Sequence, residues 1–561
     1  MHETRAKQHL GRAGKRVKTG CKTCKIRRVK CDENRPACRR CVSTGRVCDG
    51  YGIWGGGTPH ANRALSIYCT PVPVVTREEQ GSFDWFMEKA RRKFTSLYSS
   101  DFWETLVFQA SAQEPCVRHA VIALSAAHRF ERGDSPWTVP ATYGYDAARF
   151  TLQQYNKAIS YLRVGTATNK HALRVALITC MLFVTLEYLR GQYSMGSAHL
   201  RHGIQLLTNI SVPQPRSSMS PNILSPAEDF AHNALIDSYA RLAIQSAMFG
   251  HVPSRMCLVM RAPAGNAFPP EFHSMQHARQ TLDNLMNRAH CLKRHLHDLK
   301  PEGRLTDESE FFDTRHKILT ELSCWHQAFR ATLAHIKTET TSPRDIHGCI
   351  LLGTYYEMVV IIASVCLPSA KETIFDSHTE NFIAMIGGFE DLCTSSSRTH
   401  IYAKELEPLL RGAEFGGQGF TVEAGFIPPV YCTGLKCRVP RVRRQAIRIL
   451  RSVPHREGVW NGPLLADVLE QVIRIEEGGL YAGDSSIEEP IVAGVLTEKD
   501  LSRPRVDGFS RIMDVSVHLP DEVNGDTIVS YKKQIGEGHW ASFTERVCPS
   551  VLRGPLDLRA T

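Results

Sequence analysis

Aromatic residues and long apolar runs are missing where they would be most informative. No Phe, Tyr or Trp occurs in residues 15–48, although RNA-binding modules usually stack bases on aromatic side chains. The mostly apolar run of residues 175–186 has 12 residues, whereas a membrane-spanning helix needs roughly 18. The first residues are polar and basic and do not contain the apolar segment of a signal peptide. These absences argue against RNA binding, membrane insertion and export.

Common catalytic motifs are missing as well. The sequence contains no G-x-S-x-G, no H-E-x-x-H and no G-x-x-x-x-G-K-[ST] pattern. Residues 50–55 match G-x-G-x-x-G in letters only, because they follow a cysteine-rich loop rather than a predicted strand and precede a poor helix start. We therefore expect the protein not to be an enzyme, although a catalytic group assembled from distant residues would leave no such motif.

Positive charge is concentrated at the N-terminus. Residues 1–48 contain 15 lysines and arginines and 3 acidic residues, whereas the rest of the chain has 53 basic and 54 acidic residues. The formal charge of +11 on the whole chain therefore comes from this end. A basic end on a near-neutral body is typical of a protein that binds the phosphates of nucleic acids.

Six of the 18 cysteines lie in this basic end with the spacing C-x2-C-x6-C-x6-C-x2-C-x6-C, at positions 21, 24, 31, 38, 41 and 48. A segment this short cannot bury a hydrophobic core and needs disulfides or metal. In a reducing compartment, paired C-x2-C units favour zinc. Two zinc sites of four cysteines each would require eight ligands, so six thiolates suffice only if two sulfurs bridge both ions.

The pattern resembles the fungal Zn2Cys6 binuclear-cluster DNA-binding domain. The match covers all six cysteines, the basic run of residues 25–30 and Pro36, two residues before the fourth cysteine. The resemblance implies two zinc ions, bridged by Cys21 and Cys38. One ion would be held by Cys21, Cys24, Cys31 and Cys38, and the other by Cys38, Cys41, Cys48 and Cys21.

A short helix after Cys24 would be fixed at both ends near the zinc, and such modules place this helix in the major groove of DNA. The resemblance implies that Arg28, assisted by Arg27, reads a CGG-like triplet, at positions where the family more often has lysine. Arginine can donate two hydrogen bonds to guanine O6 and N7. We expect the other basic residues of the module to contact phosphates, namely Lys22, Lys25, Lys30, Arg39 and Arg40.

The rest of the chain is predicted to be mainly helical. An apolar helix over 171–190 and a second over 195–207 should form a tight antiparallel hairpin, with Gly196 and Gly203 allowing close approach. Cys432 and Cys437 are placed in a loop without a second cysteine pair nearby. Residues 146–250 and 443–460 resemble the fungal-specific transcription factor middle domain, which implies an all-α, helical-repeat-like regulatory body.

Near the C-terminus the period changes from helical to extended. Met513, Val515, Val517 and Leu519 alternate with polar residues, as in a half-buried strand. A turn signal at 521–526 precedes a return strand, and a third strand is expected near residues 540–546. The sequence therefore predicts a small antiparallel sheet at this end.

Five parts are expected in order. They are a disordered basic tail (1–20), the Zn2Cys6 DNA-binding domain (21–50), a linker (51–80), the helical regulatory domain (81–490) and a C-terminal β-hairpin region (491–561). The linker is rich in glycine and proline and shows no heptad repeat. Because many members of the resembling family dimerise through a coiled coil at this point, the choice between monomer and homodimer stays open.

The favoured interpretation is a nuclear, sequence-specific, zinc-dependent transcription factor that regulates RNA polymerase II transcription. Its partners would be double-stranded DNA, the transcription machinery or coregulators, and a small-molecule effector as a further candidate. The basic runs at 15–18 and 27–30 would serve nuclear import. The alternative is an enzyme or ligand-binding protein whose helical body carries the function and whose zinc module only tethers it to DNA.

Overall fold

The computed structural model divides the chain into two compact units. One unit comprises residues 1–70 with 216–234, and the other comprises residues 71–215 with 235–561. The structure describes residues 21, 23, 24, 27, 29–33, 38–44, 76–90, 94, 97–98, 100–131, 142–164, 170–211, 226–249, 268–299, 308–336, 343–367, 371–398, 420–452, 456–491, 496–521, 525–536 and 538–547. The predicted turn at 521–526 lies partly outside these residues.

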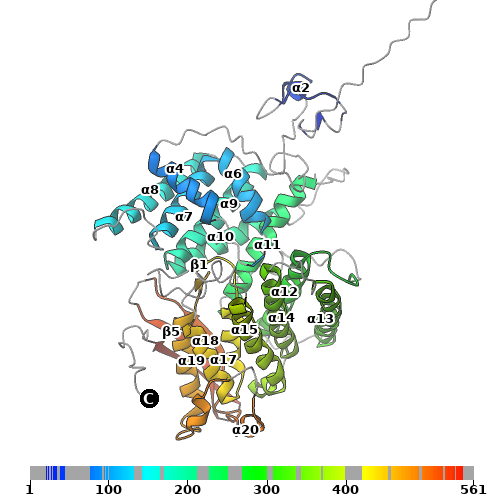
Figure 1. Cartoon of the computed structure of the whole chain (residues 1–561), viewed down its shortest axis with the longest axis vertical. Helices are drawn as coiled ribbons and strands as arrows, with labels where there is room; N and C mark the ends of the chain where they lie inside the picture. The colour runs from blue at the N-terminus through cyan, green and yellow to red at the C-terminus, as the bar shows by residue number, and fades with distance from the viewer. Residues whose placement is uncertain are drawn as a thin grey trace, which may run out of the picture. The chain divides into compact units, whose positions relative to one another are not determined.

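The protein is mainly α-helical, as the sequence predicts (Figure 1). In the described part of the cysteine module, α2 (Arg39–Val42) is a short helix, and Thr23 and Cys24 are also helical. The helical body begins with α4 (Arg77–Trp85), inside the range assigned to the linker, because the Thr76 hydroxyl caps the backbone N–H of Glu79. Further elements are η1 (Phe86–Ala90), η2 (Phe102–Leu106), α6 (Val107–Gln113), α7 (Pro115–Glu131), α8 (Thr142–Val164), α9 (Lys170–Leu189), α10 (Tyr193–Ser211), α11 (Pro226–Met248), α12 (Met275–Leu299), α13 (Glu308–Ile336), α14 (Pro343–Ser364), η5 (Glu372–His378) and α15 (Thr379–Arg398).

Helices α9 and α10 form the predicted antiparallel hairpin. Gly191 joins them with φ of +75°, a conformation that glycine adopts without strain. A β-carbon at Gly196 would lie 2.5 Å from the ring of Tyr188 on α9, and one at Gly203 would lie 2.3 Å from the ring of Tyr239 on α11. The two glycines therefore admit two buried tyrosine rings, and the Tyr239 hydroxyl donates to the carbonyl of Leu177 at 2.8 Å.

Among the described residues, two helices are long and apolar enough to cross a membrane by length and composition, namely His171–Leu189 in α9 and Asp345–Ser364 in α14. Within the helical body 72% of the first segment and 56% of the second are buried. Burial among other helices is what a core helix shows. For α9 this agrees with the prediction from its short apolar run.

The helical body continues through α17 (Ile427–Lys436), α18 (Pro440–Ser452) and α19 (Gly462–Glu477), which pack on one another and on α15. Helix α17 contains Cys432 and is followed by Cys437 as its C-cap, so the prediction of a loop there was wrong. Two prolines open this helix, which the missing first-turn hydrogen bonds permit. Its exposed backbone N–H groups are instead capped by a carboxylate from a distant segment, because Glu457 accepts hydrogen bonds from Gly425, Phe426 and Ile427 at 2.7–3.2 Å.

A small mixed sheet that the sequence did not reveal joins this region. Its strands β1 (Phe420–Thr421), β2 (Arg456–Glu457) and β3 (Trp460–Asn461) have two residues each. Strand β1 pairs parallel with β2, and β2 pairs antiparallel with β3. Such short strands carry no alternation of polar and apolar residues, so no period could predict them.

The predicted C-terminal sheet is present. Strands β4 (Ile512–His518), β5 (Thr527–Gly536) and β6 (His539–Val547) form an antiparallel sheet in the order β4-β5-β6. A bulge interrupts β4 between Met513 and Ser516, where Asp514 takes φ of +51°. The segment from η6 (Ser485–Glu488) to α20 (Glu498–Ser502) connects α19 to this sheet.

We expect Gly203→Ala to destabilise the helical body by about 1–3 kcal/mol, because the new methyl group would collide with the buried Tyr239 ring. The matched control is Gly353→Ala in α14, where a β-carbon would meet no atom within 4 Å. This control should be neutral or stabilise by up to about 1 kcal/mol through helix propensity. Urea unfolding followed by circular dichroism measures both variants, and equal midpoints would contradict the packing argument.

Candidate metal centre and nucleic-acid interface

Cysteine sulfurs make up the core of the N-terminal module. Cys21, Cys24, Cys31, Cys38 and Cys41 are at most 6% exposed, and Val29 is the apolar side chain packed against them within the described residues. Cys48 lies outside the part of the chain that the structure describes. A core of thiols with so little apolar surface cannot hold a fold by burial alone, so another interaction must supply the stability.

The sulfur positions fit zinc. Sulfurs that share a tetrahedral zinc at 2.3 Å lie about 3.8 Å apart. Among the pairs that would share an ion, Cys38 Sγ lies 3.6 Å from the sulfurs of Cys21 and of Cys24, and Cys41 Sγ lies 3.8 Å from Cys21 Sγ. Cys24 and Cys41, which would bind different ions, also lie 3.8 Å apart. The sulfurs of Cys21, Cys24, Cys31 and Cys38 all lie within 4.8 Å of one another.

The environment of the sulfurs also favours a bound cation. Desolvation raises the pKa of the Cys24 and Cys38 thiols, and a cation must offset this cost if both are to be thiolates. Backbone N–H groups already point at the sulfurs, from Cys24 to Cys21 Sγ and from Cys41 to Cys38 Sγ, both at 3.3 Å. The same bond thus recurs in both C-x2-C units, so the repeat in the sequence is a repeat in structure.

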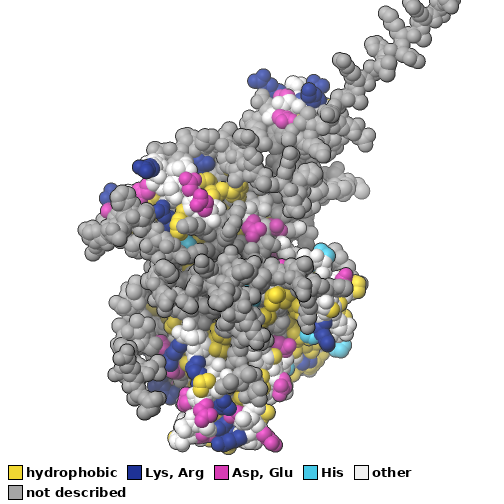
Figure 2. Space-filling view, in the orientation of Figure 1, with side chains coloured by type: hydrophobic (Ala, Val, Ile, Leu, Met, Phe, Trp, Pro, Cys, Tyr) yellow, Lys and Arg dark blue, Asp and Glu magenta, His cyan; other side chains and the backbone are white. Residues whose placement is uncertain are grey.

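Asp32, which the sequence analysis did not single out, organises the second half of the module. Its carboxylate accepts the backbone N–H groups of Arg39 at 2.9 Å and Arg40 at 3.3 Å, at the start of α2. Although desolvation alone would raise the pKa of Asp32, these backbone hydrogen bonds lower it. The side chains of Arg39 and Arg40 are exposed and free to face a phosphate backbone. Figure 2 shows basic side chains on the surface of the module.

Arg27 and Lys30 are the other predicted DNA-contacting residues within the described part. Lys30 is exposed, whereas Arg27 is half-buried and donates through Nη1 to the Thr44 hydroxyl at 3.3 Å. This bond links the segment after Cys24 to the turn after α2. Lys22, Lys25 and Arg28 lie outside the described residues.

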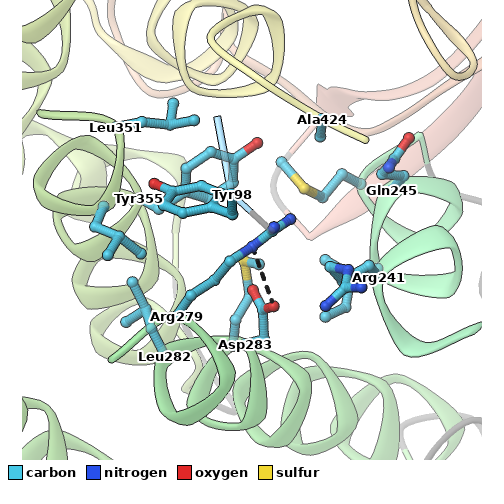
Figure 3. Close-up of a pocket in the computed structure, with 13 residues that line it drawn as sticks. Tyr98, Arg241, Gln245, Arg279, Leu282, Asp283, Leu351, Tyr355 and Ala424 are labelled. Atoms are coloured by element: carbon cyan, nitrogen blue, oxygen red, sulfur yellow. Dashed lines mark ion pairs between the residues drawn. The ribbon is translucent and has the colours of Figure 1, made fainter. Parts of the chain in front are cut away.

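A second polar cluster lies inside the helical body, where α11, α12, α14 and the segment after β1 enclose a cavity of about 40 Å³ (Figure 3). On α12, Arg279 forms an ion pair with Glu423 at 2.8 Å and lies 3.8 Å from Asp283. Its guanidinium also lies 4.4 Å above the ring of Tyr98. Burial alone would lower the pKa of Arg279, but the two carboxylates raise it.

The cavity is the size of a few water molecules, since each needs roughly 10–15 Å³. The Tyr355 hydroxyl and Gln245 Oε1 are buried beside it without a hydrogen-bond partner among the described residues, as expected where ordered water bridges polar groups. An organic effector does not fit this space. The cluster instead ties the segment after β1 to α11 and α12, because Arg241 also reaches Glu423 at 3.4 Å.

Comparison with protein families gives two matches. Residues 19–53 match the fungal Zn(2)-Cys(6) binuclear cluster domain, and residues 83–367 match the fungal specific transcription factor domain. The first match includes all six cysteines. The second ends near the C-terminus of α14, so α15 to α19 extend the helical body beyond the matched range.

Comparison with known proteins gives transcription regulators. The chain is 26% identical over 83% of its length to the aspercryptin biosynthesis cluster-specific transcription regulator of Emericella nidulans, 89% of which is covered. It is 31% identical over 33% of its length to the transcription regulator lscL of Purpureocillium lilacinum, covering 47% of that protein. A segment of 37 residues is 57% identical to the transcriptional regulatory protein moc3 of Schizosaccharomyces pombe, with 7% of each chain covered. No solved structure matches the chain.

We expect Arg279→Met to destabilise the helical body by about 3–5 kcal/mol, because it leaves Asp283 without its ion pair and the buried Glu423 with only the longer contact to Arg241. The control on the same helix is Arg288→Met, whose pair with Glu321 is about one-fifth exposed. That loss should cost at most about 1 kcal/mol.

Urea unfolding compares the two variants, and adding Glu423→Gln to Arg279→Met should restore part of the stability. Equal losses for Arg279→Met and Arg288→Met would contradict the role of the buried cluster.

Proposed function

The chain belongs to the fungal-specific transcription factor family and is a zinc-dependent, DNA-binding transcription regulator, and from this we propose that its cysteine module reads a CGG-like triplet in the major groove. The family match implies a nuclear protein, and we propose that residues 15–18 and 27–30 direct its import. The observation that carries the proposal is the set of buried, closely spaced sulfurs in the most basic part of the chain.

For the metal we propose two zinc ions that share Cys21 and Cys38. Cys24 and Cys31 would complete the site of the first ion, and Cys41 and Cys48 the site of the second. The 3.6 Å separation of the Cys21 and Cys38 sulfurs supports this assignment, because bridging ligands must lie side by side. Zinc supplies the bonds that hold the two halves of the module together, and the backbone N–H groups at Cys24 and Cys41 stabilise the thiolates.

For DNA we propose a division between base-reading and phosphate-binding residues. Arg28, assisted by Arg27, would donate to guanine O6 and N7, and Lys22, Lys25, Lys30, Arg39 and Arg40 would contact phosphates. The exposure of Lys30, Arg39 and Arg40 supports the second group. For Arg27, the bond to Thr44 supports a role that includes holding the two halves in register.

For the chain as a whole we propose five parts. Residues 1–20 form a basic tail, residues 21–50 bind DNA, and residues 51–80 are a linker. Residues 81–490 form the regulatory domain, and residues 491–561 form a C-terminal β region. The regulatory domain would contact the transcription machinery or coregulators and respond to an effector. The enzyme alternative is not favoured, because both matched families and the relatives are transcription regulators. The spacing of its preferred DNA sites would report whether the protein acts as a monomer or a homodimer.

We expect Arg28→Ala to abolish the preference for a CGG-containing duplex over a scrambled one, because a bidentate arginine–guanine contact contributes about 1–3 kcal/mol of discrimination. Binding to the scrambled duplex should change little. Mobility-shift titrations with both duplexes measure this, with zinc content determined in parallel to show that the module stays loaded.

The matched control is Arg40→Ala, which should weaken both duplexes alike and leave the ratio between them unchanged. An Arg28→Ala protein that keeps the wild-type preference would refute the assignment of base reading to this residue.

A further inference from the structure

A large groove is lined by residues 444–488, near the C-terminal end of the helical body along the chain. Helices α18 and α19 and the loop 478–488 enclose a space of about 730 Å³. Small-molecule sites typically measure roughly 300–1,000 Å³. The groove is therefore large enough for an organic ligand, unlike the cavity beside Arg279.

The loop that forms one wall has a shape set by glycine. Gly478, Gly479 and Gly483 have φ values of +51°, +90° and +86°, which side chains with a β-carbon rarely adopt. No heavy atom lies within 4 Å of where their β-carbons would be. Glycine is therefore needed here for the backbone conformation and not for close packing. Together with α18 and α19, the loop lines the groove.

The acidic side chains of the groove already have cationic partners. Arg444 pairs with Glu477 at 2.6 Å and with Glu488 at 3.2 Å. Arg451 pairs with Glu470 at 2.8 Å. The fourth carboxylate, Asp484, pairs with Arg503 from outside the groove at 3.1 Å. The negative charge of the groove is therefore neutralised within the protein.

Two arginines that line the groove have no such partner. Neither Arg448 nor Arg474 forms an ion pair with a carboxylate of the described residues. Arg448 donates to uncharged acceptors, Gln445 Oε1 and the carbonyls of Glu488 and Glu489. Arg474 is exposed and donates to Gln471 Oε1. The groove is thus lined by four arginines and four carboxylates, and within the described residues two of these arginines form no ion pair.

The surroundings of Arg448 shift the pKa of its guanidinium. Burial lowers the pKa of this guanidinium, and the neighbouring Arg441 and Arg444 lower it further against the opposing effect of Glu488. An anion bound beside Arg448 would favour its charged guanidinium, as Glu488 does. Ile447, Ile473 and Ile487 form the apolar side of the same groove.

We propose that this groove binds a small organic acid, with Arg448 and Arg474 holding its acidic groups and the isoleucines contacting its carbon skeleton. The exposed Arg474 guanidinium can bind carboxylate, sulfonate or phosphate oxygens in a two-point geometry. Arg448 already donates four hydrogen bonds within the protein, so it would contribute its charge and one further hydrogen bond. As a ligand site the groove depends only on its own geometry. Its role as the effector site of the regulator rests on the proposed function.

The test uses two fluorescent probes on the full chain, 1-anilinonaphthalene-8-sulfonate and its uncharged counterpart N-phenyl-1-naphthylamine. We expect saturable binding of the sulfonate and about a tenfold or greater loss of affinity in Arg474→Gln, because one charged contact is removed. Arg474 has a single side-chain contact, so this variant should fold. Arg448→Gln should show a similar loss, and the uncharged probe should bind all proteins alike.

The matched control is Arg201→Gln, an exposed arginine on α10 outside the groove, which should bind the sulfonate like the wild type. Unchanged sulfonate affinity in Arg474→Gln, or an equal loss in Arg201→Gln, would overturn the proposal. Mobility-shift assays on the same variants without probe separate the two proposals, because DNA binding by Arg474→Gln should equal that of the wild type whether or not the groove binds an acid.

Discussion

Metal–thiolate bonding is the interaction on which the DNA-binding end depends. The described core of this module consists of five cysteines with Val29 packed against them, and their burial raises the cost of thiolate charge unless a cation offsets it. The basic side chains need a rigid platform if they are to face fixed positions on DNA, and little other than the cluster supplies one. Asp32 and the Arg27–Thr44 bond then fix the segments that carry these side chains.

In the helical body, buried ion pairs hold distant segments together. Arg279 and Arg241 fasten Glu423 to α11 and α12, and Arg438 and Arg443 share the buried carboxylate of Glu476 at 2.7 and 2.8 Å. Glu476 also accepts the backbone N–H of Ile512, the first residue of β4. Removing one partner of such a pair is costly. The segments beyond the matched family domain are therefore joined to it by specific polar contacts as well as by apolar packing.

Those features that follow from local patterns could be predicted from the sequence. The α9–α10 hairpin and strand β4 each have a clear period, a turn signal predicts the return strand β5, and the cysteine spacing indicates the metal centre. Helix α17 could not be predicted, because its capping carboxylate comes from Glu457, 30 residues away. The groove was missed for a similar reason, since the partners of Arg444 lie 33 and 44 residues along the chain. Arg27 looked like a base-reading residue alone, and its bond to Thr44 becomes visible only in the fold.

The central claim is that two metal ions hold the sulfurs of residues 21–48 and that DNA binding requires them. The most direct measurement is native mass spectrometry of the purified full-length chain, paired with duplex affinity before and after metal removal by a strong chelator. The account predicts two zinc ions per chain, loss of duplex binding on their removal, and recovery when zinc is returned. Fewer than two ions per chain, or duplex binding that persists in the metal-free protein, would contradict it.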